Sequence, residues 1–158
     1  MTVRRARVHV SDRQRSLRLD GRRLARDAAE VLRRTGFPGD LSLSLVDDRE
    51  MGRIHAAFSK DPSPTDVLAF PLEGPRVPGA DFPAAEVVVS VETALREARA
   101  RRILPRAEVL LYVVHGVLHL LGEDDHDPVR AARMDRKTLK LLRNLGYRNR
   151  IERQWSAE

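Results

Sequence analysis

The alternation of apolar and polar residues predicts four β-strands. A two-residue period runs over residues 5–10 and returns over residues 41–45. Residues 67–70 form a short apolar run closed by a proline, and residues 86–90 form another that is rich in valine. Because an apolar, β-branched run favours a strand covered on both faces, we expect residues 86–90 to lie inside a sheet.

Helical spacing of apolar residues predicts five helices around these strands. We expect them from about residue 20 to Gly36, from Asp47 or Asp48 through Met51, Ile54 and Phe58, and over 91–102, 107–121 and 128–145. The helix over 107–121 is apolar on nearly every face, so we expect it at the centre of the molecule. Polar or Gly/Pro-rich connections cover residues 59–66 and 73–83.

This order of elements predicts an α+β fold. We expect one domain over residues 1–158, with a small mixed sheet of about four strands packed against about five helices. The arginine-rich N-terminus and the tail over about 148–158 are expected to be flexible. No internal repeat suggests a second unit.

Composition narrows the partners and the compartment. The chain has no cysteine, which excludes disulfides and thiolate metal sites, and no apolar run approaches the ~18 residues of a membrane span. We therefore expect a cytoplasmic protein with no membrane partner. The net charge is +6, and nearly all of the basic residues are arginines. Arginine suits phosphate, which favours a polyanion such as RNA, but a GC-rich genome also produces arginine in place of lysine.

Two histidines carry the strongest chemical signal. His115 and His119 stand four residues apart in the central helix, so their side chains lie on the same face, one turn apart. An isolated pair with this spacing is more often two core histidines bonded to backbone or carboxylates. Here the helix is apolar, Gly116 is expected to leave room beside His115, and the acidic segment after Gly122 offers a third ligand. We therefore predict a metal site for Zn²⁺, one ion per chain, on a buried central helix.

The expected chemistry is hydrolysis. Zinc held by three protein ligands keeps an open position for water and makes hydroxide available near neutral pH. Zinc peptidases with His-Glu-x-x-His place a general base directly after the first histidine. Position 116 is glycine here, which argues against a peptidase.

At this point the chain resembles the YbeY endoribonucleases. Residues 115–122, His-Gly-Val-Leu-His-Leu-Leu-Gly, followed by Glu-Asp-Asp-His, are similar to the family signature. Residues 64–71, Pro-Thr-Asp-Val-Leu-Ala-Phe-Pro, are similar to a second family motif, and residues 85–90 to a third. The resemblance implies a zinc-dependent endoribonuclease that matures small-subunit ribosomal RNA and supports ribosome quality control. It implies ribosomal RNA and the small subunit as partners, with a ribosomal protein or an assembly GTPase beside them.

Two departures from the family pattern leave alternatives open. The family's third ligand lies ten residues after the first, which makes it Asp125 here, while an insertion of one residue makes it His126. The arginine that the family carries before the Pro-Thr-Asp motif is Ser59, and the adjacent Lys60 is only a weak catalytic candidate. The catalytic side chain therefore stays unknown, with a zinc-bound water proposed. Either another arginine substitutes or the nuclease is weakened.

A second function stays open beside the enzyme. A non-catalytic or weakly catalytic ribosome-assembly factor would bind RNA or a ribosomal protein and use its zinc only for structure. The arginines that could contact RNA in either case lie near the first strand, on the first helix and on the third: Arg4, Arg5, Arg7, Arg22, Arg23, Arg26, Arg96, Arg99, Arg101 and Arg102. Thr65 and Asp66 are expected to form a turn, and Asp66 also to orient a ligand histidine.

Overall fold

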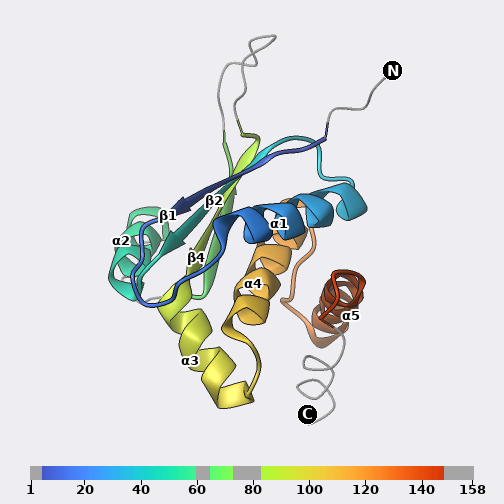
Figure 1. Cartoon of the computed structure of the whole chain (residues 1–158). Coiled ribbons are helices and arrows are strands. Elements are labelled where there is room, and N and C mark those ends of the chain that lie inside the picture. The colour runs from blue at the N-terminus through green and yellow to red at the C-terminus, as the bar shows by residue number, and fades with distance from the viewer. Residues whose placement is uncertain (1–4, 60–64, 73–82, 148–158) are drawn as a thin grey trace.

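The structure, a computed structural model, describes residues 5–59, 65–72 and 83–147. Within them a mixed sheet carries helices on both faces (Figure 1). The elements in chain order are β1 (Val8–Asp12), α1 (Gly21–Thr35), β2 (Leu41–Val46), α2 (Asp48–Ser59), β3 (Val67–Pro71), β4 (Ala85–Ser90), α3 (Val91–Arg101), α4 (Pro105–Leu120) and α5 (Pro128–Asn144). The predicted α+β fold and the predicted order of its elements are confirmed.

The sheet has the strand order β1-β2-β4-β3. β1, β2 and β4 run parallel, and β3 pairs antiparallel with β4 at the edge. Val87 of β4 lies between Leu43 of β2 and Ala69 of β3. β4 is thus an inner strand, buried at Ala85 and from Val87 to Ser90, as its apolar run predicts.

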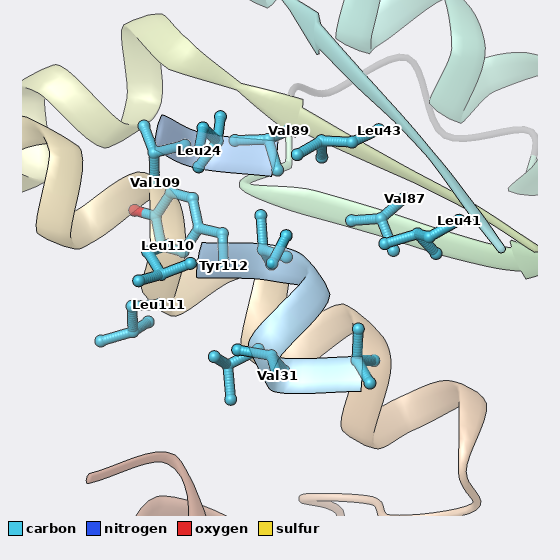
Figure 2. Packing of buried hydrophobic residues seen from close by; sticks show 14 of the residues in the cluster. Leu24, Val31, Leu41, Leu43, Val87, Val89, Val109, Leu110, Leu111 and Tyr112 are labelled. Carbon is cyan, nitrogen blue, oxygen red and sulfur yellow. The ribbon is translucent and has the colours of Figure 1, made fainter. Parts of the chain in front are cut away.

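The main core lies between one face of the sheet and helices α1 and α4. Figure 2 shows side chains of β2 and β4 together with residues of α1 and α4 in this core: Leu41, Leu43, Val87, Val89, Leu24, Val31 and Leu110. α4 is the central helix of the molecule, because eleven of its sixteen residues are buried. Its near-uniform apolar character, read from the sequence, therefore matches its position.

The opposite face of the sheet is covered by α2. Met51 packs there against Val46 and Val88 in a second, smaller apolar cluster. Phe58, which helical spacing places on the same inward stripe, is instead 67% exposed. Its ring stacks on Phe70 of the edge strand β3, with ring centroids 4.8 Å apart. The last turn of α2 therefore covers the sheet edge from outside rather than entering the core.

The first strand begins later than predicted. Alternation suggests residues 5–10, but the strand extends over Val8–Asp12. Its register is set by β2, since Val8 lies opposite Leu41 and Asp12 opposite Leu45. The start is fixed by Asp40, whose Oδ1 accepts a hydrogen bond from the Arg7 backbone N–H at 2.9 Å. The alternation of apolar and polar residues predicts that β1 exists, but its pairing with β2 determines where it begins.

The carboxylate of Asp48 joins the first turns of α2 and α3. Its Oδ1 accepts hydrogen bonds from the hydroxyls of Ser90 and Thr93 at 2.6 and 2.8 Å, and its Oδ2 pairs with Arg96 at 2.6 Å. Burial acts to raise the pKa of Asp48, but the hydrogen bonds from Ser90, Arg96 and Thr93 outweigh it and lower the pKa below 3.8. The ionised form is therefore the one that the fold stabilises.

We expect Asp48→Asn to cost about 1–3 kcal/mol of unfolding free energy at neutral pH, because the charged acceptor is lost. A folded-state pKa below the unfolded value means that this stabilisation is present above 3.8 and is lost as the pH falls through the folded pKa. The stability difference from wild type should therefore close below about pH 4. Urea unfolding at several pH values measures this difference in unfolding free energy.

Asp47→Asn is the matched control, since the Asp47 side chain accepts the Glu50 N–H at the start of α2 and asparagine caps equally well. A difference that stays constant down to pH 2 contradicts the assignment.

Among the described residues, no single helix is both long and apolar enough to cross a membrane. The pair Val91–Arg101 and Pro105–Leu120 meets the length and composition criteria only when taken together, and it is bent by 119° at its break.

Candidate metal centre

α4 places His115 and His119 on consecutive turns in its C-terminal half. Pro105 occupies the first turn of the helix, where no N–H is needed, and the helix ends at Leu120. Gly122 follows with φ +91°, a conformation that favours glycine and turns the chain sharply. The acidic segment after it is thereby brought back beside the end of the helix.

That turn fixes the orientation of His119. The His119 Nδ1 lies 3.0 Å from the backbone oxygen of Glu123. A carbonyl oxygen can only accept, so Nδ1 carries the proton and Nε2 carries the lone pair. The His119 residue is exposed. A backbone oxygen on one ring nitrogen is the arrangement that metal-binding histidines ordinarily have.

His115 has a buried ring nitrogen that lacks a partner. Its Nε2 is buried and makes no hydrogen bond to any described residue. Burial lowers the pKa of His115; the negative charge of Asp66 opposes this, and His119 adds to it. The imidazole is therefore neutral near pH 7, which is the form that binds a metal. A buried ring nitrogen without a partner costs stability, and a metal ion bound to its lone pair would satisfy it.

The third ligand is not brought to these two nitrogens. Across residues 5–59, 65–72 and 83–147, no three His, Asp or Glu side chains lie close enough together to hold one ion. Asp125 and His126 are both exposed in the turn between α4 and α5. Asp125 is near enough for its charge to raise the pKa of His115. The choice between Asp125 and His126 therefore stays a prediction.

The other acidic residues of this turn are engaged in the fold. Asp127 caps α5 by accepting the Arg130 N–H at 2.9 Å. Asp124 pairs with the Arg130 guanidinium at 2.9 Å, and Glu123 pairs with Lys137. Within the part of the chain that the structure describes, Asp125 and His126 carry no such side-chain bond, so they are the members of the segment left to bind a ligand.

Gly116 faces the sheet rather than the histidines. A Cβ atom added there would lie 3.0 Å from both methyl groups of Val87 and 3.5 Å from Ala69. The expectation that Gly116 leaves room beside His115 is therefore wrong, because that space belongs to the packing of α4 on β4. A glutamate base could not stand at this position without separating the helix from the sheet, which strengthens the argument against a peptidase.

The segment before β3 behaves as the predicted turn. Asp66 Oδ1 accepts hydrogen bonds from the Val67 N–H at 2.8 Å and from the Thr65 hydroxyl at 3.3 Å. The Asp66 charge also reaches His115, without a hydrogen bond between them among the described contacts. Ser59 ends α2 by donating its hydroxyl to the backbone oxygen of His55 at 2.8 Å. Lys60 lies outside the described residues.

Sequence reasoning missed a polar pair on the histidine-bearing face of α4. Glu108 is fully buried, and its Oε1 pairs with Nη1 of Arg101 at 3.0 Å. Glu108 stands seven residues before His115, a spacing of two helical turns. The signal was present, since a glutamate inside an otherwise apolar helix needs a partner.

Comparisons with known proteins point to one family. A family model described as Endoribonuclease YbeY matches residues 9–146. A protein named Endoribonuclease YbeY from Anaeromyxobacter sp. (strain Fw109-5) is 40% identical over 147 residues, covering 92% of this chain and 73% of that protein. Proteins of the same name from Anaeromyxobacter dehalogenans and Rhodopirellula baltica are 39% and 38% identical over 79% and 68% of this chain, which spans only 64% and 55% of their lengths.

A solved structure shares the fold. The solution structure of a Thermotoga maritima protein superposes with a TM-score of 0.57 and 24% identity, over 85% of this chain and 86% of that one.

Proposed function

The chain belongs to the YbeY endoribonuclease family, and from that premise we propose that it is a zinc-dependent hydrolase that cleaves single-stranded RNA at the His115–His119 face of α4. The substrate proposed is ribosomal RNA of the small subunit, cleaved during maturation and quality control in the cytoplasm. A ribosomal protein or an assembly GTPase is the proposed protein partner.

The observation that carries this proposal is the unpartnered Nε2 of His115. A buried polar atom without a hydrogen-bond partner is rare in folded proteins and needs an explanation. His119, one turn away, presents the lone pair of its own Nε2 because its Nδ1 is occupied by the Glu123 carbonyl. Two neutral imidazoles with this spacing fit zinc, and Asp125 or His126 would complete the set.

When bound, zinc would supply a water of lowered pKa and a positive charge for the developing negative charge on phosphorus-bound oxygen. The protein's own residues do the rest. The Glu123 carbonyl holds the His119 ring, and burial keeps His115 neutral. The net charge of the chain, +6, favours a polyanionic substrate.

Removal of the metal tests the proposal directly. We expect protein treated with a chelator to lose cleavage of a single-stranded ribosomal RNA fragment, and stoichiometric Zn²⁺ to restore it. We also expect the melting temperature to rise when Zn²⁺ is returned, because only the folded state presents both imidazoles. Measuring RNA products by gel and zinc by atomic absorption checks both. Cleavage that persists at full rate in zinc-free protein refutes the metal-dependent reaction.

A second function is favoured by one observation. The position of the family arginine is occupied by Ser59, whose hydroxyl bonds the His55 carbonyl at the end of α2. A serine supplies no positive charge for RNA at this position. A chain that binds ribosomal RNA without cutting it, with zinc in a structural role, would fit this. Stoichiometric zinc and tight RNA binding with no cleavage product in the same assay would favour the assembly factor over the nuclease.

A further inference from the structure

Glu108 is the most deeply buried charged side chain described in the structure. It is 0% exposed and lies in the first half of α4, with buried apolar residues on either side along the helix. Burying a carboxylate is costly unless a cation and hydrogen bonds compensate. The compensating cation is Arg101 at the end of α3, whose Nη1 lies 3.0 Å from Glu108 Oε1. The second oxygen, Oε2, is buried and has no hydrogen-bond partner at bonding distance among the described residues, although the neighbouring Tyr112 hydroxyl acts to lower the pKa of Glu108.

The position of this pair along α4 relates it to the candidate metal centre. Glu108, Tyr112, His115 and His119 follow one another at spacings of four, three and four residues. At 3.6 residues per turn these side chains form one row along a single face of the helix. Arg101 is therefore held at one end of the row whose other end carries the two histidines.

The Arg101 side chain lies at the boundary between the protein interior and the surface. The Arg101 side chain is 40% exposed, although its carboxylate partner is fully buried. On the outer side it meets Glu97 at 3.5 Å, and that glutamate is itself 46% exposed. An exposed ion pair of this kind contributes little to stability and exchanges readily for another anion. The contact to Glu108 is shorter, buried and directional, so it fixes the arginine.

We propose that Arg101 contacts a phosphate of RNA bound along the His115–His119 face, and that Glu108 is the positioning residue that holds the guanidinium there. The inference rests on the proposed function and names one phosphate-binding residue of that site. Arginine suits this task because its planar fork can bond a buried carboxylate and an incoming phosphate at the same time. In the bound state the phosphate takes the place of Glu97, while the bond to Glu108 is kept.

The outer side of the guanidinium already holds an anion, the Glu97 carboxylate. Burial raises the pKa of Glu108, and Arg101 opposes that rise. Exchange of Glu97 for a phosphate replaces one anion by another on the outer side of the guanidinium, and the bond to Glu108 stays in place.

The test measures binding of a single-stranded RNA to zinc-loaded protein by rapid mixing, over times too short for cleavage products to form. We expect Arg101→Ala to weaken binding about tenfold. We also expect it to reduce the slope of log affinity against log salt by about 0.7, the contribution of one phosphate contact on a single strand. Arg101→Lys should keep most of the slope and lose part of the affinity. Arg136→Ala is the control, since it removes an exposed arginine of α5 and should leave affinity and slope near wild type.

Two further variants separate positioning from folding. Glu108→Leu fills the buried space with an apolar side chain, so we expect its melting temperature to stay near wild type while RNA affinity falls as in Arg101→Ala. Glu97→Ala should bind RNA at least as tightly as wild type. Zinc content should be unchanged in all of them.

The outcomes are distinguishable. An Arg101→Ala protein with the affinity and salt slope of wild type overturns the inference, as does loss of zinc in that variant. If wild-type protein binds no RNA, the proposed function itself fails, and this inference fails with it.

Discussion

Replacement of His115 by leucine is expected to remove zinc from the protein and to abolish cleavage of single-stranded RNA. The reason is that His115 supplies one of the two imidazoles on α4, and an ion held by the remaining ligands would be lost at ordinary zinc concentrations. The same change should not destabilise the metal-free protein. It removes the buried, unpaired Nε2 of His115, whose desolvation costs about 1–3 kcal/mol.

The metal-free leucine variant is therefore expected to melt at or above the temperature of metal-free wild type. Calorimetry of both proteins after chelation checks this, beside zinc analysis and the RNA assay. His9→Ala is the matched control, since His9 is a half-exposed histidine on the edge strand β1 and should keep zinc, cleavage and stability. Full zinc content in the His115→Leu protein would remove this residue from the metal centre.

Gly116→Ala is expected to destabilise the protein by about 1–3 kcal/mol, although alanine favours a helix over glycine by about 1 kcal/mol. The added methyl group would lie 3.0 Å from both γ-carbons of Val87, a buried residue of an inner strand that has little freedom to move. Helix α4 would have to lift from β4, and the row of polar side chains on α4 would move with it. Chemical denaturation of the zinc-free protein measures the cost.

A compensating change identifies the contact. Val87→Ala should make room for the methyl group, so Gly116→Ala in that background is expected to be neutral or stabilising, with a coupling energy of at least about 1 kcal/mol. Leu110→Ala serves as the comparison, since it lies in the same helix and should add to Gly116→Ala without coupling. Equal costs of Gly116→Ala in both backgrounds would show that Val87 is not the obstacle.

The sequence is informative where one period dominates a segment. The apolar helix around residues 107–121 and the valine-rich strand around 86–90 were predicted close to their observed bounds. Both elements are buried on nearly all sides, so nearly all of their residues are apolar and the change in composition marks where they end. The sequence-based predictions fail where contacts with a neighbouring element set the bounds of a strand or the position of a side chain. The start of β1 follows from its register with β2. Phe58 lies outside the core because its ring stacks on Phe70 of the edge strand β3.

The candidate metal centre divides in the same way. Spacing alone identifies His115 and His119, since helix geometry fixes their relation. The third ligand depends on how the chain turns between α4 and α5, which is governed by the bonds of Asp124 and Asp127 to Arg130. The partner of Glu108 could not be read from periodicity either, because it requires the angle between α3 and α4.

Helix α5 gives the candidate metal centre a further property. The helix packs mainly against α4, through Met134, Thr138, Leu141 and Leu142, and it begins at the turn that carries Asp125 and His126. An element attached to one neighbour can open separately from the rest of the protein, at a lower free energy than global unfolding. An ion shared between α4 and that turn would link the opening of α5 to metal release. Amide hydrogen exchange along α5 would then report how firmly the metal is held.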